Sequence, residues 1–192
     1  EGDAQFLKDG CQGEPTIEDY DRAVVAAKLP NLIRPIMKTL LTALGEQRNG
    51  KLAGVTTKKS AYEYLCLVER HREARGRFFR FWQDQKLDAL LSPGFSYPAQ
   101  KRGDAKDILI GACYTFIYNT LNLPTGAVPI TVVKEGEDVY PKSMSKYHDM
   151  AYQKIAETIK GSVGMPVSVQ LTTLPFEEEK CVSIMAQLEE VV

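Results

Sequence analysis

The chain has 192 residues, of which 44% are hydrophobic and 26% charged, and its formal net charge is −1. This length and apolar content suffice for a buried core in one domain, and the near-neutral charge gives no electrostatic case for a nucleic-acid partner. No apolar run reaches 18 residues and no signal peptide is recognisable, so we expect no membrane-spanning segment. The chain opens with Glu1 in what reads as the middle of a fold, and we expect a piece of a longer protein.

The cysteines and histidines indicate no metal centre. The four cysteines lack the spacing of metal ligands, and three fall in helical patterns, which predicts reduced thiols packed in a core. The two histidines are far apart in the sequence. We therefore expect no metal and no other cofactor. These residues are Cys11, Cys66, Cys113, Cys181, His71 and His148.

The first two helices are predicted from their start signals. Thr16 can cap a helix, and Asp19 stands three residues on, where an acidic residue answers the cap. Asn31 can cap a second helix over Leu32–Leu44, and Pro35 falls in its first turn, where the missing N–H costs least.

The helix predicted at 32–44 carries an aliphatic stripe. An ordinary amphipathic helix packed on a core explains such a stripe, and so does a helix that lies in a membrane interface with basic residues at headgroup level. Arg34, Lys38 and Thr42 are expected on the opposite, polar side. The residues that would contact a membrane are Leu32, Ile33, Ile36, Met37, Leu40, Leu41 and Leu44.

Residues 45–59 contain three glycines and no periodicity, which predicts a linker.

Ser60 and Glu63 then form a capping box for a long helix. Two arginines, Arg72 and Arg75, interrupt its apolar stripe, and we expect the charges there to be solvated or paired. The pairs within reach are Glu69–Arg72 and Glu73–Arg77. The aromatic residues at 78–82 are expected to serve in packing.

The stretch from Gly111 to Val133 predicts the end of an apolar helix, a turn at Pro124 and Gly126, and a β-branched strand. Because residues 127–133 are apolar on both faces, we expect this strand inside a sheet covered by helices. Alternation of strands and helices predicts an α/β fold. The remaining predicted elements are strands at 88–92 and 165–173, a helix at 145–160 and a final helix from Pro175.

Three features in this order resemble the C-terminal third of the amidase signature enzymes. They are N-x-x-x-x-P-x-G-x-x-P at 119–129, G-[LM]-P-V-x-V-Q at 164–170 and a Glu-rich final helix. Within the family the sequence is most similar to the animal fatty acid amide hydrolase branch, through Leu90–Pro93, Tyr114–Asn119 and Ser162–Val167.

This resemblance implies that residues 1–192 form the C-terminal portion of a single amidase domain with a mixed β-sheet covered by helices. It further implies membrane-cap helices at 16–44, a linker at 45–59 and a sheet-and-helix core at 60–192.

The resemblance also implies a Ser–Ser–Lys triad, in which the lysine acts as base through a bridging serine. Neither the nucleophile loop nor its lysine occurs in these residues, so we name no catalytic residue. What the resemblance implies for this chain is an acyl channel lined by Ala112, Phe116 and Asn119, with Tyr114 as a fourth candidate. A channel tryptophan of the family is replaced at or near Ala151. Plain core packing is the alternative for Phe116.

We therefore expect part of a serine amidase that hydrolyses fatty acid amides to a fatty acid and an amine. The expected partners are a lipid amide, a membrane surface and a second copy in a homodimer, with no nucleic acid. The expected location is intracellular, on the cytosolic, reducing side of an endomembrane.

Two alternative functions stay open. The first is a general amidase or amidotransferase-like enzyme for polar substrates, against which the stripe at 32–44 argues; the second is a non-catalytic binding protein with the amidase fold.

Overall fold

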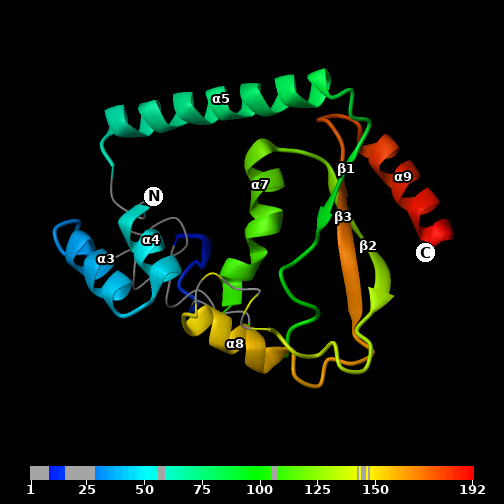
Figure 1. The fold of residues 1–192 in the computed structure, drawn as a ribbon. Coiled ribbons are helices and arrows are strands. Elements are labelled where there is room, and N and C mark those ends of the chain that lie inside the picture. Colours follow the sequence, from blue (N-terminus) through cyan, green and yellow to red (C-terminus); the bar gives the residue numbers. More distant parts are fainter. Residues whose placement is uncertain are drawn as a thin grey trace. The chain divides into compact units, whose positions relative to one another are not determined.

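The computed structural model describes residues 9–15, 29–55, 59–104, 108–141, 143, 146 and 148–192 (Figure 1). The helix predicted after Thr16 lies outside these residues. The chain divides into two compact units. The first unit comprises Glu1–Val68, Arg102–Ile108 and Pro141–Lys154, and the second comprises Glu69–Lys101, Leu109–Tyr140 and Ile155–Val192.

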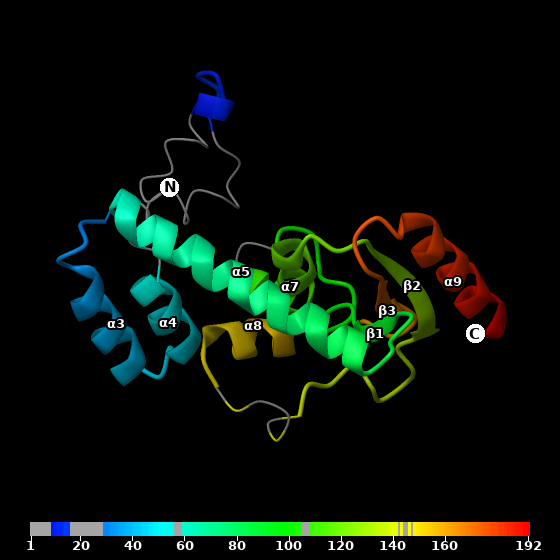
Figure 2. The ribbon, with the colours of Figure 1, turned by 90° about the horizontal axis from the view of Figure 1, so that it is seen from above.

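In the first unit, α3 (Arg34–Ala43) and α4 (Gln47–Val55) form a helical hairpin, which Figures 1 and 2 show from two sides. Gly50 of α4 is buried against α3, because a Cβ there would lie 2.7 Å from Thr42 Oγ1 and 3.2 Å from Lys38 O. Glycine therefore permits the close approach of the two helices. The predicted linker at 45–59 therefore contains a helix, α4, which contact with α3 stabilises although it has no strong apolar period of its own.

The start of α3 differs in detail from the prediction. Ile33, not Asn31, occupies the N-cap position, while Pro35 lies in the first turn as predicted. Arg34 lies on the side predicted to be polar, yet it is buried, with its Nε donating to Leu29 O at 3.2 Å. A buried guanidinium needs such acceptors, and the carbonyl before the helix supplies one.

The long helix α5 (Ala61–Asp84) begins in the first unit and continues into the second. Its capping box is confirmed: the N–H of Glu63 donates to Ser60 Oγ at 3.2 Å, and the N–H of Ser60 donates to Glu63 Oε2 at 2.7 Å. Trp82 is buried and lies 5.9 Å from the Phe78 ring, in line with the predicted packing role. The guanidinium of Arg75 lies 5.0 Å from the Phe79 ring centroid.

The second unit contains a three-stranded sheet in the order β1-β3-β2, with β1 at Leu90–Pro93, β2 at Thr125–Val132 and β3 at Pro166–Thr172. Both pairings are antiparallel, with Leu91 opposite Leu171 and Val128 opposite Val169. The described strands thus form an antiparallel sheet, where a mixed one was expected.

The strand predicted to be buried on both faces is β2, and in the described sheet it is an edge strand. Val128 is its one buried residue. The pairing shifts register between Pro129 and Thr131. Proline has no N–H to contribute to a ladder, so edges and bulges are where it is tolerated. The apolar run indicated a strand correctly, but apolarity alone did not place it in the sheet.

Helices complete the second unit. They are η1 (Leu109–Ala112), α7 (Cys113–Leu121), α9 (Glu178–Val191) and the end of α8 (Met150–Thr158), which begins in the first unit. On β2, Gly126 faces α9, since a Cβ there would overlap the Met185 sulfur.

Among the four free cysteines, Cys181 is buried and Cys113 is exposed, so the prediction of core thiols is wrong for Cys113. No helix in the described ranges is both long and apolar enough to cross a bilayer.

Candidate functional site

The helix predicted to line a substrate channel is α7, and its start is fixed by an aromatic contact. Gly111 precedes the helix, and a Cβ at this position would overlap the ring of Tyr97. Tyr97 is buried and its hydroxyl donates to Gln100 Oε1 at 3.1 Å. Glycine at 111 therefore lets the tyrosine ring lie directly against the η1–α7 segment.

Polar side chains tie the body of α7 to the sheet. The Tyr118 hydroxyl donates to Ser92 Oγ on β1 at 2.7 Å. Gln170 of β3 is buried, and its Nε2 donates to Pro93 O at 2.8 Å and to Tyr114 O at 3.0 Å. The glutamine that closes the G-[LM]-P-V-x-V-Q motif thus bridges a neighbouring strand and a helix, which gives its place in the pattern a physical reason.

The end of α7 is held from α5. His71 Nε2 lies 2.7 Å from Thr120 O, one of the carbonyls in the last turn of α7. Asn122 follows in the left-handed conformation at φ 55°, and the N–H of Leu123 donates to Tyr118 O at 3.0 Å. The helix therefore ends in an αL cap before Pro124 is reached.

The four predicted channel residues occupy different environments. Ala112, just before the helix, is buried, whereas Phe116 and Tyr114 are 46% and 41% exposed and Asn119 is exposed. Helical spacing brings Phe116 and Asn119 together on an open side. Ile117, 49% exposed, was not singled out from the sequence, although it lies one turn from Tyr114. We call Tyr114, Phe116 and Ile117 the α7 face, and its part in a channel stays a prediction. Ala151 is buried on the first turn of α8.

A second apolar surface lies on α3. Of the seven residues predicted to contact a membrane, five are exposed, with Leu32 at 85% and Leu44 at 69%. Met37 and Leu41 are half-buried. Leu52 of α4, also exposed, was not predicted. We call the exposed five, Leu32, Ile33, Ile36, Leu40 and Leu44, the α3 face.

The orientation of α3 is the reverse of that of a helix packed on a core. Arg34, Lys38 and Thr42 share one side of α3, four residues apart. Arg34 is buried, and the backbone of Lys38 and the side chain of Thr42 receive Gly50 of α4. The hairpin thus packs through the side expected to be polar and leaves the aliphatic side open. Exposed apolar patches of this kind mark interaction surfaces.

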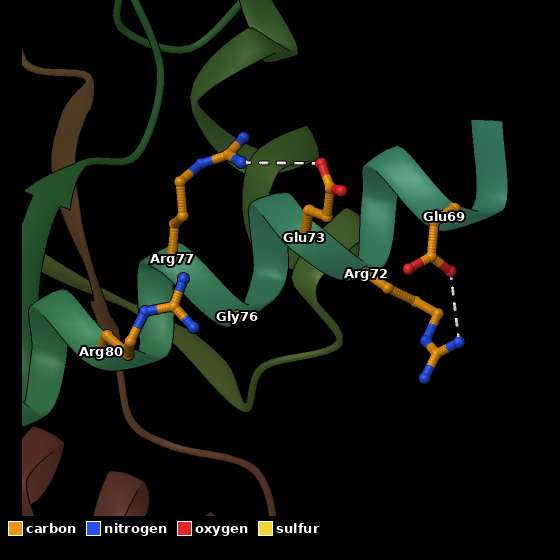
Figure 3. A pocket seen from close by; sticks show the side chains of 6 residues that line it. All are labelled: Glu69, Arg72, Glu73, Gly76, Arg77 and Arg80. Atoms are coloured by element: carbon orange, nitrogen blue, oxygen red, sulfur yellow. Dashed lines mark hydrogen bonds and ion pairs between the residues drawn. The ribbon is translucent and has the colours of Figure 1, made fainter. Parts of the chain in front are cut away.

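A hollow of about 430 Å³ lies on α5, and Figure 3 shows the side chains that line it. Four of the lining residues form two exposed ion pairs, Arg72–Glu69 at 3.2 Å and Arg77–Glu73 at 3.9 Å. The two predicted ion pairs are thus confirmed, whereas Arg75 is half-buried over the Phe79 ring. Exposed pairs contribute little to stability and are screened by salt, and no ligand is assigned to the hollow. The lining residues are Glu69, Arg72, Glu73, Gly76, Arg77 and Arg80. In the described part of the chain, no His, Cys, Asp and Glu residues gather into a group that could hold a metal.

Comparison with known proteins gives the class of this chain. The sequence profile of the amidase family matches residues 8–182, and the chain belongs to that family. The predicted resemblance is thereby confirmed over most of the sequence.

Individual relatives are more specific. The chain is 28% identical over 162 residues to fatty-acid amide hydrolase 1 of Sus scrofa. This alignment covers 82% of this chain and 26% of the relative. It is 31% identical over 124 residues to fatty acid amide hydrolase 1 of Caenorhabditis elegans, in an alignment that covers 64% of this chain and 21% of the relative. The chain therefore spans about a quarter of the length of these curated relatives.

A solved structure of a fatty acid amide hydrolase superposes with a TM-score of 0.56 at 18% identity, covering 83% of this chain and 32% of the other. At this identity the likeness supports the fold, an α/β arrangement with a small antiparallel sheet and helices.

Proposed function

We propose that this chain is part of an amidase that hydrolyses the carbon–nitrogen bond of fatty acid amides at a lipid surface. The observation that carries the proposal is the amidase match over residues 8–182, together with two relatives named as fatty acid amide hydrolases. The triad of such an enzyme is not among these residues, and the proposed contribution of this chain is to bind substrate and lipid.

The α7 face supports an apolar substrate. Phe116 and Ile117 are about half exposed on a helix whose start, body and end are each fixed by contacts in the second unit. A rigid apolar surface suits an acyl chain, because each CH₂ removed from water contributes about 0.8 kcal/mol. In this proposal Ala112, Tyr114, Phe116 and Asn119 contact the acyl chain.

The α3 face supports the lipid surface. Helices that lie in a membrane interface bind through buried apolar area, and α3 presents its aliphatic side outward. Free cysteines fit a reducing compartment, so we place the protein on the cytosolic side of an internal membrane.

The test uses the protein encoded by the complete reading frame. We expect Phe116→Ala to lower kcat/KM for long-chain amides by about 1–3 kcal/mol, or roughly 5- to 150-fold, and to leave short-chain amides near the wild-type value. The physical reason is that only a long chain reaches this side chain. The control is Val182→Ala, which truncates an exposed apolar residue on α9.

An equal loss at every chain length would show that Phe116 serves in packing and would contradict the channel assignment. Hydrolysis of short polar amides alone would favour a general amidase. Absence of hydrolysis from wild-type protein that binds the amides would favour a non-catalytic binding protein.

A further inference from the structure

The first turn of α8 is capped by a residue from a distant part of the chain. The N–H of Met150 donates to Glu46 Oε1 at 2.8 Å, across 104 positions of sequence. The N–H of Tyr152 donates to Asp149 Oδ1 at 3.1 Å. The other oxygen of Glu46 accepts from Asn49 Nδ2 at 2.9 Å, which fixes the orientation of the carboxylate. Two of the N–H groups that a helix start leaves unsatisfied thus have carboxylate acceptors, one supplied from outside the helix.

A buried ion pair joins the same two segments. Asp149 Oδ2 lies 3.4 Å from Arg48 Nε, and the side chains of Asp149 and Arg48 are 1% and 24% exposed. A carboxylate buried to this degree is strongly destabilising when its charged partner is removed. The positions of Arg48 and Asp149 are therefore interdependent.

Glu46 and Arg48 are placed by the helical hairpin. The N–H of Glu46 donates to Leu41 O at 2.8 Å, at the end of α3. The absence of a side chain at Gly50 lets α4 lie directly against Thr42 of α3. The two residues that contact α8 thus belong to the hairpin that carries the α3 face, and both views of the ribbon place the first turn of α8 beside α4 (Figures 1 and 2).

We infer that Glu46 and Arg48 clamp α8 to the α3–α4 hairpin, so that the order of the first turn of α8 depends on the state of the hairpin. This turn carries Ala151 and Tyr152, both buried. Because coupling between two sites is reciprocal, a ligand that holds the hairpin through the α3 face also stabilises α8. That ligand is a phospholipid surface, and this last step rests on the proposed function.

Hydrogen exchange in the protein encoded by the complete reading frame tests the clamp. We expect Glu46→Met to speed exchange in peptides covering residues 149–158 by about tenfold, the effect of losing one hydrogen bond. We expect Arg48→Met to speed it by more than that, because it removes the charged partner of the buried Asp149 carboxylate. Arg48→Lys should restore part of the protection, because it keeps the charge near Asp149. The matched control is Glu63→Met, which removes a carboxylate that caps α5 from within its own first turn; it should leave α8 unchanged.

A second variant disturbs the hairpin away from the contacts with α8. A side chain at position 50 would push α4 off α3, so Gly50→Val should speed exchange in α8 although Glu46 and Arg48 are intact. Exchange in α8 that stays at the wild-type rate in Glu46→Met, or in Gly50→Val with a loosened α3, would overturn the inference.

The lipid step is tested with phosphatidylcholine vesicles. In wild type they should slow exchange in both α3 and α8, and in Glu46→Met they should slow it in α3 alone. Vesicles that protect α3 but never α8 would overturn the coupling. If vesicles protect neither helix in wild type, the proposed lipid contact is wrong. The clamp itself is tested separately, by exchange in the Glu46→Met and Gly50→Val variants without lipid.

Discussion

The helices α3 and α9 have similar sequence patterns and opposite surroundings. Each carries an aliphatic stripe at helical spacing. In α9 the stripe lies against the sheet at Cys181, which is buried and whose Sγ donates to Leu171 O at 3.6 Å, and at half-buried Met185 beside Gly126 of β2, while Val191 at its end is exposed. In α3 five of the seven stripe residues are exposed, and the helix packs through the side of Arg34 and Thr42.

The difference teaches what periodicity does and does not determine. A period of 3.6 residues fixes which side of a helix is apolar. Which side becomes covered depends on the partner. For α9 the partner is a strand with a glycine at the contact, and for α3 it is a helix with a glycine facing the polar side. Each contact depends on one residue outside the helix itself.

The largest expected effect is on lipid binding, which we expect of the aliphatic stripe of α3 and not of α9. Ile36→Ser with Leu40→Ser should weaken co-sedimentation of the complete protein with vesicles by about 3–6 kcal/mol if both side chains enter lipid. The melting temperature should barely move, because both residues are exposed. The matched control on α9 is Val182→Ser with Val191→Ser, two exposed residues whose loss should leave vesicle binding unchanged. Equal sedimentation of all three proteins would return α3 to the ordinary amphipathic class.

The next effect concerns the covered stripe of α9. Gly126→Ala should lower the free energy of unfolding by about 1–3 kcal/mol, since the new methyl overlaps Met185 and forces repacking. The control is Gly76→Ala on α5, where a Cβ would lie 3.6 Å from Arg80 Nη1, an ordinary contact. That change should stabilise the helix by about 0.5–1 kcal/mol. Chemical denaturation measures both, and the same sign for the two variants would contradict this account of α9 docking.

Much of the fold could be predicted from the sequence because its signals are local. Capping at Ser60 and the β-branched run at β2 each depend on a few neighbouring residues. The turn after α7 was predicted too far along the chain, at Pro124 and Gly126, because Asn122 in the αL conformation ends the helix and Gly126 already lies in β2. The helix α4 could not be predicted, because its stability comes from contact with α3. The edge position of β2 was likewise missed, since strand order is a property of the whole sheet.

The candidate sites were predicted only as far as helix faces. Spacing placed Ala112, Phe116 and Asn119 on one side of α7, but it could not show that Ala112 is buried while the other two are exposed. The aliphatic stripe of α3 was identified in full, while its exposure followed from a tertiary contact of Gly50. The contact between Glu46 and Met150 has no local signal at all, because it joins positions 104 apart.

The smallest expected effect extends the comparison to the starts of helices. The α3 helix has Ile33 at its N-cap and no acidic residue in its first turn, whereas α5 starts with the Ser60–Glu63 capping box. Hydrogen bonds from the backbone N–H and the hydroxyl of Ser60 hold the pKa of Glu63 below its ordinary value of 4.5. A carboxyl whose pKa is lowered by folding stabilises the folded state above its unfolded pKa, and this contribution is lost as the pH falls through the folded pKa.

The start of α5 should therefore fray below about pH 4.5, while the start of α3 stays indifferent to pH over the same range. Glu63→Gln keeps an acceptor for the Ser60 N–H but cannot be protonated in this range, so it should abolish the pH dependence while preserving most of the cap. The measurement is the amide shift of Ser60 by NMR between pH 6 and pH 3, with the amide of Ile33 as the internal reference. An equal pH response at the two amides, or one that persists in Glu63→Gln, would mean that a general loosening of the chain and not the capping box governs the start of α5.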